Sequence, residues 1–393
     1  MLASIFAASL LATTVQAPAQ SFEAWVEGFW PTARAAGISR DTYVRAFQGV
    51  SPDPEVIESA TYQPEYKRPV GEYVDRVVSD KRLQTGGEML LQHQRLLDAI
   101  ENKYGVDRHI VVAIWGVETS YGDNLGEHYV IQALATLAYR GVKAKFARQQ
   151  LIEALKVLQR GDVSRQYMAG SWAGAMGHTQ FIPTTYQAYA VDFDGDGRRN
   201  IWQSLPDALG STAAYLKVSG WRPGHTWGYE VTVPSNMNPN NYSAKNLKSL
   251  ATWEKMGVRR VSGAPFPRPG DKAALYAPEG KNGPIFLTLH NFRVILRYNN
   301  ASSYALSVGH LADRLMGYGT FAKSWPTDEN HLSLEQRKEL QTRLLHAGYL
   351  DGEVDGVIGP ATLGAVKAYQ RQKGLNVDGF PSLTLLKMLR AET

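Results

Sequence analysis

Cysteine is absent from all 393 positions of the sequence. The chain can therefore form no disulfide bond, no thiolate metal site and no cysteine nucleophile. It also lacks the cysteine to which the lipid of a lipoprotein is attached. We therefore expect a protein without a lipid anchor, soluble once it is exported.

Charged tracts and long apolar runs are also missing. The 42 Lys and Arg residues exceed the 37 Asp and Glu residues, which gives a net charge of +5 and a pI of about 9.1. A mild positive excess suits a polyanionic partner such as nucleic acid, an anionic membrane face or a cell-wall polymer. No Lys/Arg-rich tract is present, so we expect no nucleic-acid partner. No run beyond the N-terminus approaches transmembrane length.

Several catalytic signatures are missing as well. The nine histidines are scattered without an HExxH pair, and there is no GxSxG elbow, P-loop or dinucleotide fingerprint. Each of these motifs marks a specific chemistry. Their absence argues against zinc proteases, α/β-hydrolases and nucleotide-dependent enzymes.

The N-terminus carries an apolar run at residues 2–15, LASIFAASLLATTV, which is too short to span a bilayer. Ala17-Pro18-Ala19 follows, a small-residue pattern typical of a cleavage site. We predict a signal peptide at residues 1–19, although no Lys or Arg precedes the apolar run. The alternative is a buried N-terminal helix.

Apolar residues recur at helical spacing along much of the chain, which predicts a mainly α fold with some β structure (α+β). The proline-rich stretch 51–70 is instead expected to be extended. Helices are expected at 22–50 (two short ones), 88–103, 108–119, 129–139, 144–159, 183–190, 205–219 and 301–317.

Composition also predicts how the chain divides. The main domain is expected at residues 20–320. Within it, residues 222–290 are rich in Pro, Gly and Asn with short strand-like pieces, which predicts a small mixed subdomain. A linker is expected at 321–332 and a compact helical module at 333–393.

An acidic residue stands at the end of an apolar helix. Residues 111–122 read VVAIWGVETSYG, with Glu118 directly after Val117. A carboxylate in such a helix is costly unless something uses it, and desolvation raises its pKa. A carboxylic acid protonated near neutral pH is what general-acid cleavage of a glycosidic bond requires. The alternative is a buried glutamate that satisfies a helix end or a neighbouring arginine.

A second unusual segment, AGSWAGAMGHTQFIPTTY at 169–186, is rich in small residues. Glycine lets a ligand approach the backbone closely. Ser171 and Gln180 could then hydrogen-bond polar substrate groups. The alternative is a tight packing turn between helices.

Tyrosine is abundant, and several tyrosines lie near polar motifs: Tyr73, Tyr121, Tyr215, Tyr298 and Tyr304. Such side chains suit sugar rings because they offer an apolar face and a hydroxyl group. The alternative is an ordinary place in the core.

Together these segments resemble the B family of lytic murein transglycosylases. GVETSYG at 116–122 is similar to the family's catalytic-glutamate motif, and GSWAGAMGHTQFIPTTY at 170–186 to its central signature. VDFDGDGRRNIW at 191–202 and RYNNASSYALSV at 297–308 are similar to its later motifs. The resemblance covers residues 22–318 and implies a lysozyme-like helical catalytic domain.

The resemblance implies cleavage of the bond between N-acetylmuramic acid and N-acetylglucosamine in peptidoglycan without water, leaving a 1,6-anhydromuramic end. Glu118 would protonate the leaving oxygen and then take the proton of the C6 hydroxyl group. One carboxylate suffices for this, whereas ordinary glycosidases usually need two. No second acid stands in the Glu118 motif or at 171–186, and the resemblance gives the nearby Asp123 no role.

By position, Ser171 and Gln180 match family residues that contact substrate near the acid. The family commonly has adjacent arginines where this chain has Val142 and Lys143. Lys143 would keep one positive charge toward peptide carboxylates, without the bidentate fork of arginine. A further set matches residues of the groove that hold sugars or the glutamate: Tyr73, Tyr215, Tyr298, Asn299 and Tyr304.

The loop at 192–207 begins like an EF-hand, with acids at positions one, three and five and Gly197 at six. Position twelve is Gln203, not a glutamate, and Asp207 could substitute for it. Some members of the resembled family bind a cation here, so we expect a structural Ca²⁺ or Na⁺ site and no cofactor required for catalysis. The alternative is a metal-free turn. The predicted ligands are Asp192, Asp194, Asp196, Arg198 and Asp207.

Residues 350–379 resemble the three-helix peptidoglycan-binding domain. The markers are Asp355-Gly356, Gly359, Thr362, Tyr369-Gln370 and Val377-Asp378-Gly379. The resemblance implies that glycan strands of peptidoglycan are the partner and that the module raises the local substrate concentration by tethering. With the predicted signal peptide, it places the protein in the periplasm.

Two other functions stay open on the sequence. A hydrolytic muramidase would cut the same bond and release a reducing end. A non-catalytic peptidoglycan-binding scaffold would bind the wall without cutting it, although the intact GVETSYG motif argues against this.

Overall fold

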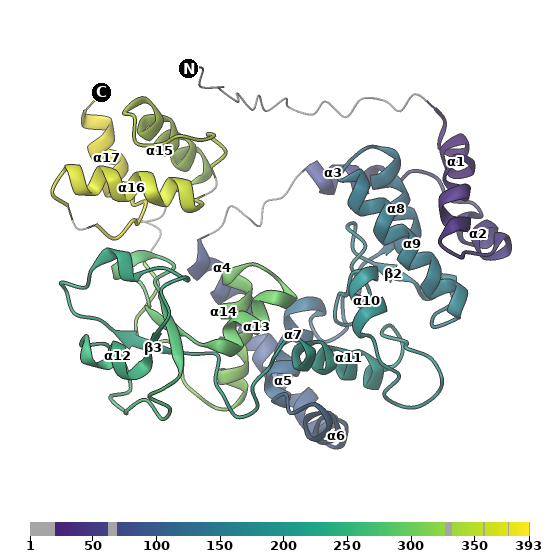
Figure 1. Ribbon diagram of the computed structural model, residues 1–393, viewed down its shortest axis with the longest axis horizontal. Coiled ribbons are helices and arrows are strands. Elements are labelled where there is room, and N and C mark those ends of the chain that lie inside the picture. Colours follow the sequence, from purple (N-terminus) through teal and green to yellow (C-terminus); the bar gives the residue numbers. More distant parts are fainter. Residues whose placement is uncertain (1–19, 62–68, 327–331, 357, 376, 393) are drawn as a thin grey trace, which may run out of the picture. The chain divides into compact units, whose positions relative to one another are not determined.

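The computed structural model describes residues 20–61, 69–326 and 332–392, apart from 357 and 376 (Figure 1). The predicted signal peptide at 1–19 lies outside the described residues. The chain divides into two compact units, one comprising Met1–Gln63 and Gly122–Thr212, the other Pro64–Tyr121 and Ala213–Thr393. Among the helices in the described part of the chain, none has the length and apolar character needed to cross a membrane.

The first unit is helical with one short antiparallel ladder. Ser21 and Ser39 start its first two helices, each accepting a hydrogen bond from the amide three residues on. Helices α8 and α9 pack together through buried alanine and leucine side chains. The elements are α1 (Phe22–Ala35), α2 (Arg40–Phe47), α3 (Pro54–Thr61), β1 (His128–Tyr129), α8 (Val130–Tyr139), α9 (Ala144–Arg160), β2 (Ala169–Gly170), α10 (Pro183–Tyr189) and the start of α11 (Leu205–Val218).

Helix α3 corrects one expectation, since residues 51–70 were predicted to be extended. Pro54 occupies the first helical position, where its fixed φ suits a helix and its missing N–H costs nothing. The carboxylate of Asp53 accepts a hydrogen bond of 2.9 Å from the Glu55 amide and so caps the first turn. A proline-rich composition therefore marked a helix start here.

The helical part of the second unit surrounds α7. Seven residues of α7 in succession, Ile110 to Gly116, are buried, because the helix packs against both α14 and α5. Gly105 in a left-handed conformation ends α6, and the Asp107 side chain caps the start of α7. The helices are α4 (Val70–Val77), α5 (Asp80–Gln92), α6 (Gln94–Tyr104), α7 (Arg108–Thr119), α13 (His290–Tyr298) and α14 (Ser302–Leu315).

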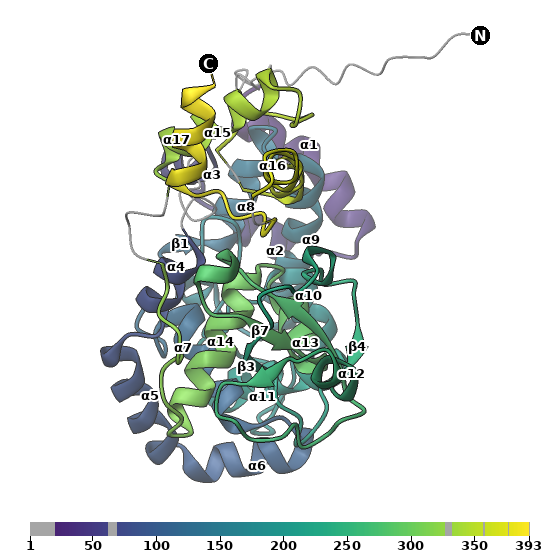
Figure 2. The same cartoon turned by 90° about the vertical axis from the view of Figure 1, so that its left-hand side faces the viewer.

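A five-stranded antiparallel sheet confirms the small mixed insertion (Figure 2). Its strands run in the order β4-β6-β7-β3-β5. A core around Trp253, Leu275 and Leu287 lies under the sheet, and Phe292 of α13 packs against Trp227 and Tyr276 beside it. The elements are β3 (Gly228–Thr232), β4 (Lys248–Ser249), α12 (Leu250–Lys255), β5 (Arg259–Arg260), β6 (Lys272–Tyr276) and β7 (Phe286–Thr288).

The predicted linker begins with packed side chains. The ring of Phe321 stacks on His310 at 3.8 Å between centroids. Trp325 lies so close to Gly71 that a Cβ atom there would come within 2.6 Å of the indole. The first residues of the stretch 321–332 are therefore held against α14 and α4.

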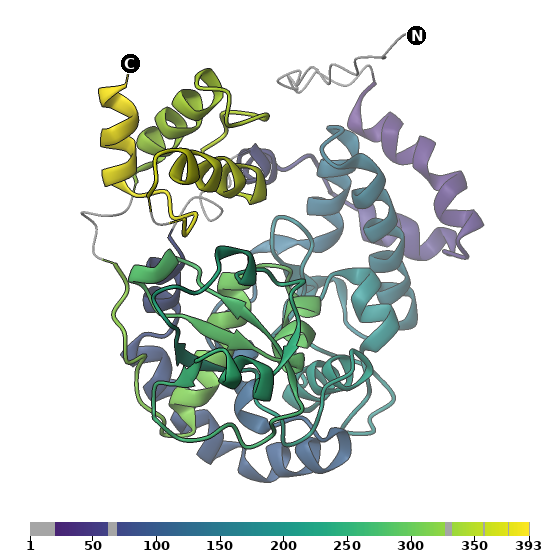
Figure 3. The same ribbon diagram turned by 60° about the vertical axis from the view of Figure 1, so that its left-hand side comes forward.

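Three helices form the C-terminal module, drawn in yellow-green to yellow in Figure 3. They share a core that includes Leu340, Leu344, Val366, Tyr369 and Leu386. The mainly helical fold with a three-helix C-terminal module is thus confirmed. The helices are α15 (Leu334–His346), α16 (Pro360–Gln372) and α17 (Leu383–Ala391).

Candidate active site

Glu118 lies in the last turn of α7 with its side chain half-buried. Its Oε1 atom accepts a hydrogen bond of 2.6 Å from the hydroxyl group of Tyr304 on α14. Burial raises the pKa of Glu118 to about 7, and the hydrogen bond from Tyr304 opposes that rise. The carboxyl group is therefore protonated in a large fraction of molecules at neutral pH, as a general acid must be.

The backbone behind Glu118 is held in an unusual turn. Ser120 and Tyr121 both adopt left-handed conformations, with φ of 50° and 65°. The Tyr121 ring folds back over Gly116, where an added Cβ atom would lie 2.5 Å from it. This close approach explains why glycine is needed two residues before the acid.

Arg82 of α5 completes this turn and was not among the predicted residues. Its Nε atom donates to the carbonyl oxygen of Gly116 at 2.9 Å, and its guanidinium donates to the Ser120 hydroxyl at 3.1 Å. The hydroxyl group of Tyr121 donates in return to the Arg82 carbonyl at 2.8 Å. No sequence signal points to Arg82, because its partners lie more than thirty positions away along the chain.

A row of tyrosines continues from Tyr304. The Tyr298 ring lies parallel to Tyr304 at 6.5 Å, and Tyr215 meets Tyr298 edge-on at 5.2 Å. Tyr215 is anchored by its hydroxyl group, which donates to the Arg297 carbonyl. Burial, followed by the nearby charge of Glu118, raises the pKa of Tyr304 well above its usual value, so this hydroxyl stays protonated and can donate.

Tyr73, Asn299 and Tyr304 line a cavity of about 550 Å³ in the second unit. The side-chain oxygen of Asn299 accepts a hydrogen bond of 3.2 Å from the Ala301 amide at the start of α14. The guanidinium of Arg76 lies 5.8 Å from the Tyr73 ring. The second unit thus holds Glu118 and all five of the aromatic and asparagine groove residues predicted from the sequence.

Ser171 and Gln180 belong to the first unit, in the loop after β2. The Ser171 hydroxyl oxygen accepts from the Ala175 amide at 3.0 Å, while the Ser171 amide donates to the Ala175 carbonyl at 2.8 Å. Gln180 has a left-handed φ of 53°, and its amide nitrogen donates to the carbonyls of Leu125 and Gly177. The loop is a tight turn. The two hydrogen bonds that the Gln180 side-chain nitrogen donates also fix the orientation of its side-chain oxygen.

Lys143 is an exposed residue in the first unit, with a left-handed φ of 46° directly before α9. It does not share the loop of Ser171 and Gln180. Its predicted contact with peptide carboxylates stays a prediction.

The acidic loop brings carboxylate oxygens of Asp192, Asp194, Asp196 and Asp207 within 4.8 Å of one another. Asp207 is buried and accepts from the amides of Phe193 and Asn200 at 2.7 Å each. Asp192 and Asp196 also accept backbone amides of the loop, including the bond from the Arg198 amide to Asp196. Four converging oxygens suit a hard cation, and they include the predicted substitute for position twelve. The same bonds would also hold a metal-free turn.

Comparison with known proteins gives two family matches. The profile of the transglycosylase SLT domain matches residues 21–313. The profile of a peptidoglycan binding domain matches residues 333–389.

Three relatives illustrate the similarity. Crystal structures of SltB3 from Pseudomonas aeruginosa, in complex with NAG-anhNAM-pentapeptide and with NAG-NAM-pentapeptide, are 50% identical, with a TM-score of 0.90 over 94% of this chain and 100% of theirs. The membrane-bound lytic murein transglycosylase B of Escherichia coli (strain K12) is 32% identical over 244 residues, 61% of this chain and 65% of that protein. The Escherichia coli lytic transglycosylase Slt35 in complex with calcium is 26% identical, with a TM-score of 0.64 over 75% of this chain and 92% of that one.

Proposed function

We propose, from the premise that the chain belongs to the transglycosylase SLT domain family and carries a peptidoglycan binding domain, that it cleaves the β-1,4 bond between N-acetylmuramic acid and N-acetylglucosamine without hydrolysis. The family makes it a peptidoglycan lytic transglycosylase. The product would be a 1,6-anhydromuramic end. The observation that carries this proposal is the Glu118 carboxyl group, whose pKa is raised by desolvation and which accepts a hydrogen bond from Tyr304.

Glu118 would act twice. In its protonated form it gives its proton to the glycosidic oxygen, and the leaving sugar departs from C1. The resulting carboxylate then takes the proton of the muramic acid C6 hydroxyl, whose oxygen bonds to C1 and closes the anhydro ring. The carboxyl group ends protonated again, and no water enters the reaction.

The surroundings of Glu118 support a mechanism with one carboxylate. Burial and the Tyr304 hydrogen bond are the influences on its pKa, and no second carboxylate of the described chain is among them. Hydrolytic glycosidases usually pair the acid with a second carboxylate as base or nucleophile. The 50% identical SltB3 supports the product, because its crystal structures contain NAG-NAM-pentapeptide and NAG-anhNAM-pentapeptide.

The remaining predicted residues take supporting roles in this proposal. Tyr304 positions the acid, while Ser171 and Gln180 contact the sugars near it and Lys143 faces stem-peptide carboxylates. The other groove residues, Tyr73, Tyr215, Tyr298 and Asn299, hold sugar rings. The C-terminal module at 333–393 tethers the enzyme to glycan strands in the periplasm, after removal of the signal peptide at 1–19.

We further propose a structural Ca²⁺ in the loop at 192–207, held by the predicted set that includes Asp207. The calcium complex of Slt35 supports a cation in this family. The ion would stabilise the loop and take no part in the reaction at Glu118.

The test is digestion of purified sacculi followed by mass spectrometry of the glycan ends. We expect anhydro ends from the native protein and none from E118Q, with D123N as the matched control that keeps activity, since Asp123 is an exposed carboxylate close to Glu118 in sequence. Reducing ends instead of anhydro ends would identify a hydrolytic muramidase. Binding of sacculi without release of any fragment would identify a scaffold.

A further inference from the structure

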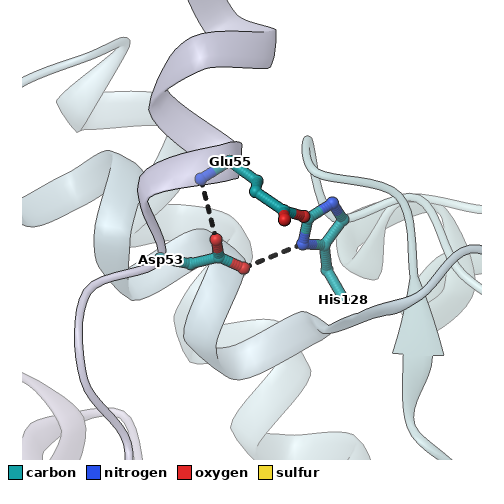
Figure 4. Close-up of side chains that lie close together, drawn as sticks. All are labelled: Asp53, Glu55 and His128. Atoms are coloured by element: carbon teal, nitrogen blue, oxygen red, sulfur yellow. Dashed lines mark hydrogen bonds and ion pairs between the residues drawn. The ribbon is translucent and has the colours of Figure 1, made fainter.

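A second cluster of possible ligands lies in the first unit, outside the residues assigned above. Asp53, Glu55 and His128 place two carboxylate oxygens and an imidazole nitrogen within 4.8 Å of one another. Figure 4 shows the side chains of Asp53 and Glu55 both extending from the start of α3 toward the imidazole of His128. The cluster joins the start of α3 to β1, two elements that are more than seventy positions apart.

Asp53 and His128 are already held in place. The Nδ1 atom of His128 lies 2.9 Å from Asp53 Oδ2, and both side chains are 17% exposed. The Asp53 amide donates to the Thr136 hydroxyl at 3.0 Å, and Asp53 Oδ1 accepts the Glu55 amide. The position of the pair is therefore fixed by the backbone of α3 and by α8 before any ligand arrives.

Glu55 supplies the movable third group. Its carboxylate is exposed, while its backbone is fixed in the first turn of α3. In the described part of the chain, neither Glu55 nor Asp53 is ion-paired with lysine or arginine. Two carboxylates thus meet one imidazole, and among the described residues no lysine or arginine forms an ion pair with either carboxylate.

We propose that Asp53, Glu55 and His128 bind a divalent transition-metal ion of the Zn²⁺ type. One imidazole nitrogen with two carboxylate oxygens forms a three-ligand set at distances of about 2.0–2.2 Å, with water completing the shell. The metal would take the place of the hydrogen between Asp53 and Nδ1 of His128. That proton leaves Nδ1, and the neutral imidazole then carries its single N–H proton on Nε2. The Asp192–Asp207 loop offers only oxygen and suits Ca²⁺, whereas an imidazole favours a transition metal.

The position of the cluster gives the ion a structural consequence. His128 pairs with Gly170 in the β1–β2 ladder, and Gly170 directly precedes Ser171. A metal bound at His128 would therefore tie the start of α3 to the strand pair that carries the Ser171 loop. Binding of an ion by the folded chain alone stabilises that chain, so Zn²⁺ would raise its melting temperature.

The test is calorimetric titration of the chelator-treated, untagged full chain with Zn²⁺ in saturating Ca²⁺. We expect E55Q and H128A each to weaken Zn²⁺ binding at this site by about tenfold or more, since even outer-shell changes cost this much. E55Q preserves the capping of α3, which uses the Glu55 backbone. It therefore decides the question even if H128A does not fold.

H225A is the matched control, because His225 lies 3.0 Å from Asp271 with similar exposures of 25% and 20%. This pair has no third ligand within reach in the described chain. We expect H225A to bind Zn²⁺ like the native protein. We also expect Co²⁺ bound to the native protein to give an absorption spectrum that is lost in E55Q. Equal Zn²⁺ binding by the native protein, E55Q and H128A would overturn the proposal and leave only adventitious binding.

Discussion

The Glu118 carboxyl group is governed by two opposing contacts. Burial favours its neutral form, while the hydroxyl of Tyr304 favours the charged form by donating to it. The balance leaves a pKa of about 7. An acid with this pKa can both give a proton and take one back near neutral pH, which is what the proposed reaction asks of one residue.

Removing the Tyr304 hydroxyl should shift this balance. In Y304F the charged carboxylate loses a donor, so the pKa of Glu118 rises further above its usual range. Because the acid must start protonated, the alkaline fall in rate, centred near pH 7 in the native enzyme, moves to higher pH. A hydrogen bond to a charged group contributes about 1.5–3 kcal/mol, so kcat should also fall about 10- to 100-fold.

The measurement is the pH dependence of anhydro-product release for the native enzyme and Y304F. Y43F is the control, because it also removes the hydroxyl group of a buried tyrosine. The hydroxyl of Tyr43 lies in the first unit and donates to the Val26 carbonyl, not to Glu118. An unshifted profile for Y304F would show that the hydrogen bond does not set the pKa of Glu118.

At the scale of elements, α7 presents Glu118 through the turn that follows it. Gly116 makes room for the Tyr121 ring, and the Tyr121 hydroxyl binds the Arg82 carbonyl. Arg82 in turn binds the Gly116 carbonyl, so α5 and the end of α7 form a closed set of contacts. A small change in this turn should therefore reach the acid.

G116A tests that dependence. The added methyl would lie 2.5 Å from the Tyr121 ring, so the ring must move and its hydrogen bond is strained. Overpacking of this kind lowers the free energy of unfolding by about 1–3 kcal/mol. We therefore expect both a lower kcat and a lower unfolding midpoint in urea. G87A in α5 is the control, since no atom lies within 4 Å of its added methyl. It should be neutral or more stable by up to about 1 kcal/mol.

Helical periodicity was enough to place most of the helices. The end of α6 at Gly105 and the start of α7 at Asp107 lie close to the predicted boundaries, because left-handed glycine and side-chain caps are local features. The predicted helix 88–103 instead became parts of α5 and α6, which meet at His93 without a proline or glycine to mark the break. Arg82 escaped notice because its role depends on contacts far along the chain.

At the scale of the whole molecule, the predicted site residues fall into both compact units. Glu118 and the tyrosine row belong to the second unit, and Ser171, Gln180 and the acidic loop belong to the first. The order of the motifs was enough to identify the family. The division itself could not be read from sequence, because each unit is assembled from two separate stretches of chain.

The C-terminal module should act on binding and leave the chemistry unchanged. A chain ending at Pro326 keeps Trp325 against Gly71 but loses α15, α16 and α17. Linking two binding sites raises affinity by about 10²–10⁴, so binding to sacculi should weaken by about 10² or more while kcat on a short soluble glycan is kept. Sedimentation with sacculi measures the first and product release the second. Equal binding by both chains would remove the tethering role.

The desolvation of Glu118 also makes the stability of the folded chain depend on pH. Its pKa rises from 4.5 to about 7 on folding, so between these pH values the unfolded chain has lost a proton that the folded chain keeps. Stability from this group therefore falls as pH rises through that window. E118Q removes this titrating group. Its free energy of unfolding should exceed that of the native protein by about 1–3 kcal/mol at pH 8 and equal it at pH 4. Urea titrations at both pH values measure the difference. The native enzyme would thus lose stability at the alkaline end of its range, where the inactive variant E118Q would stay folded under conditions that unfold the active enzyme.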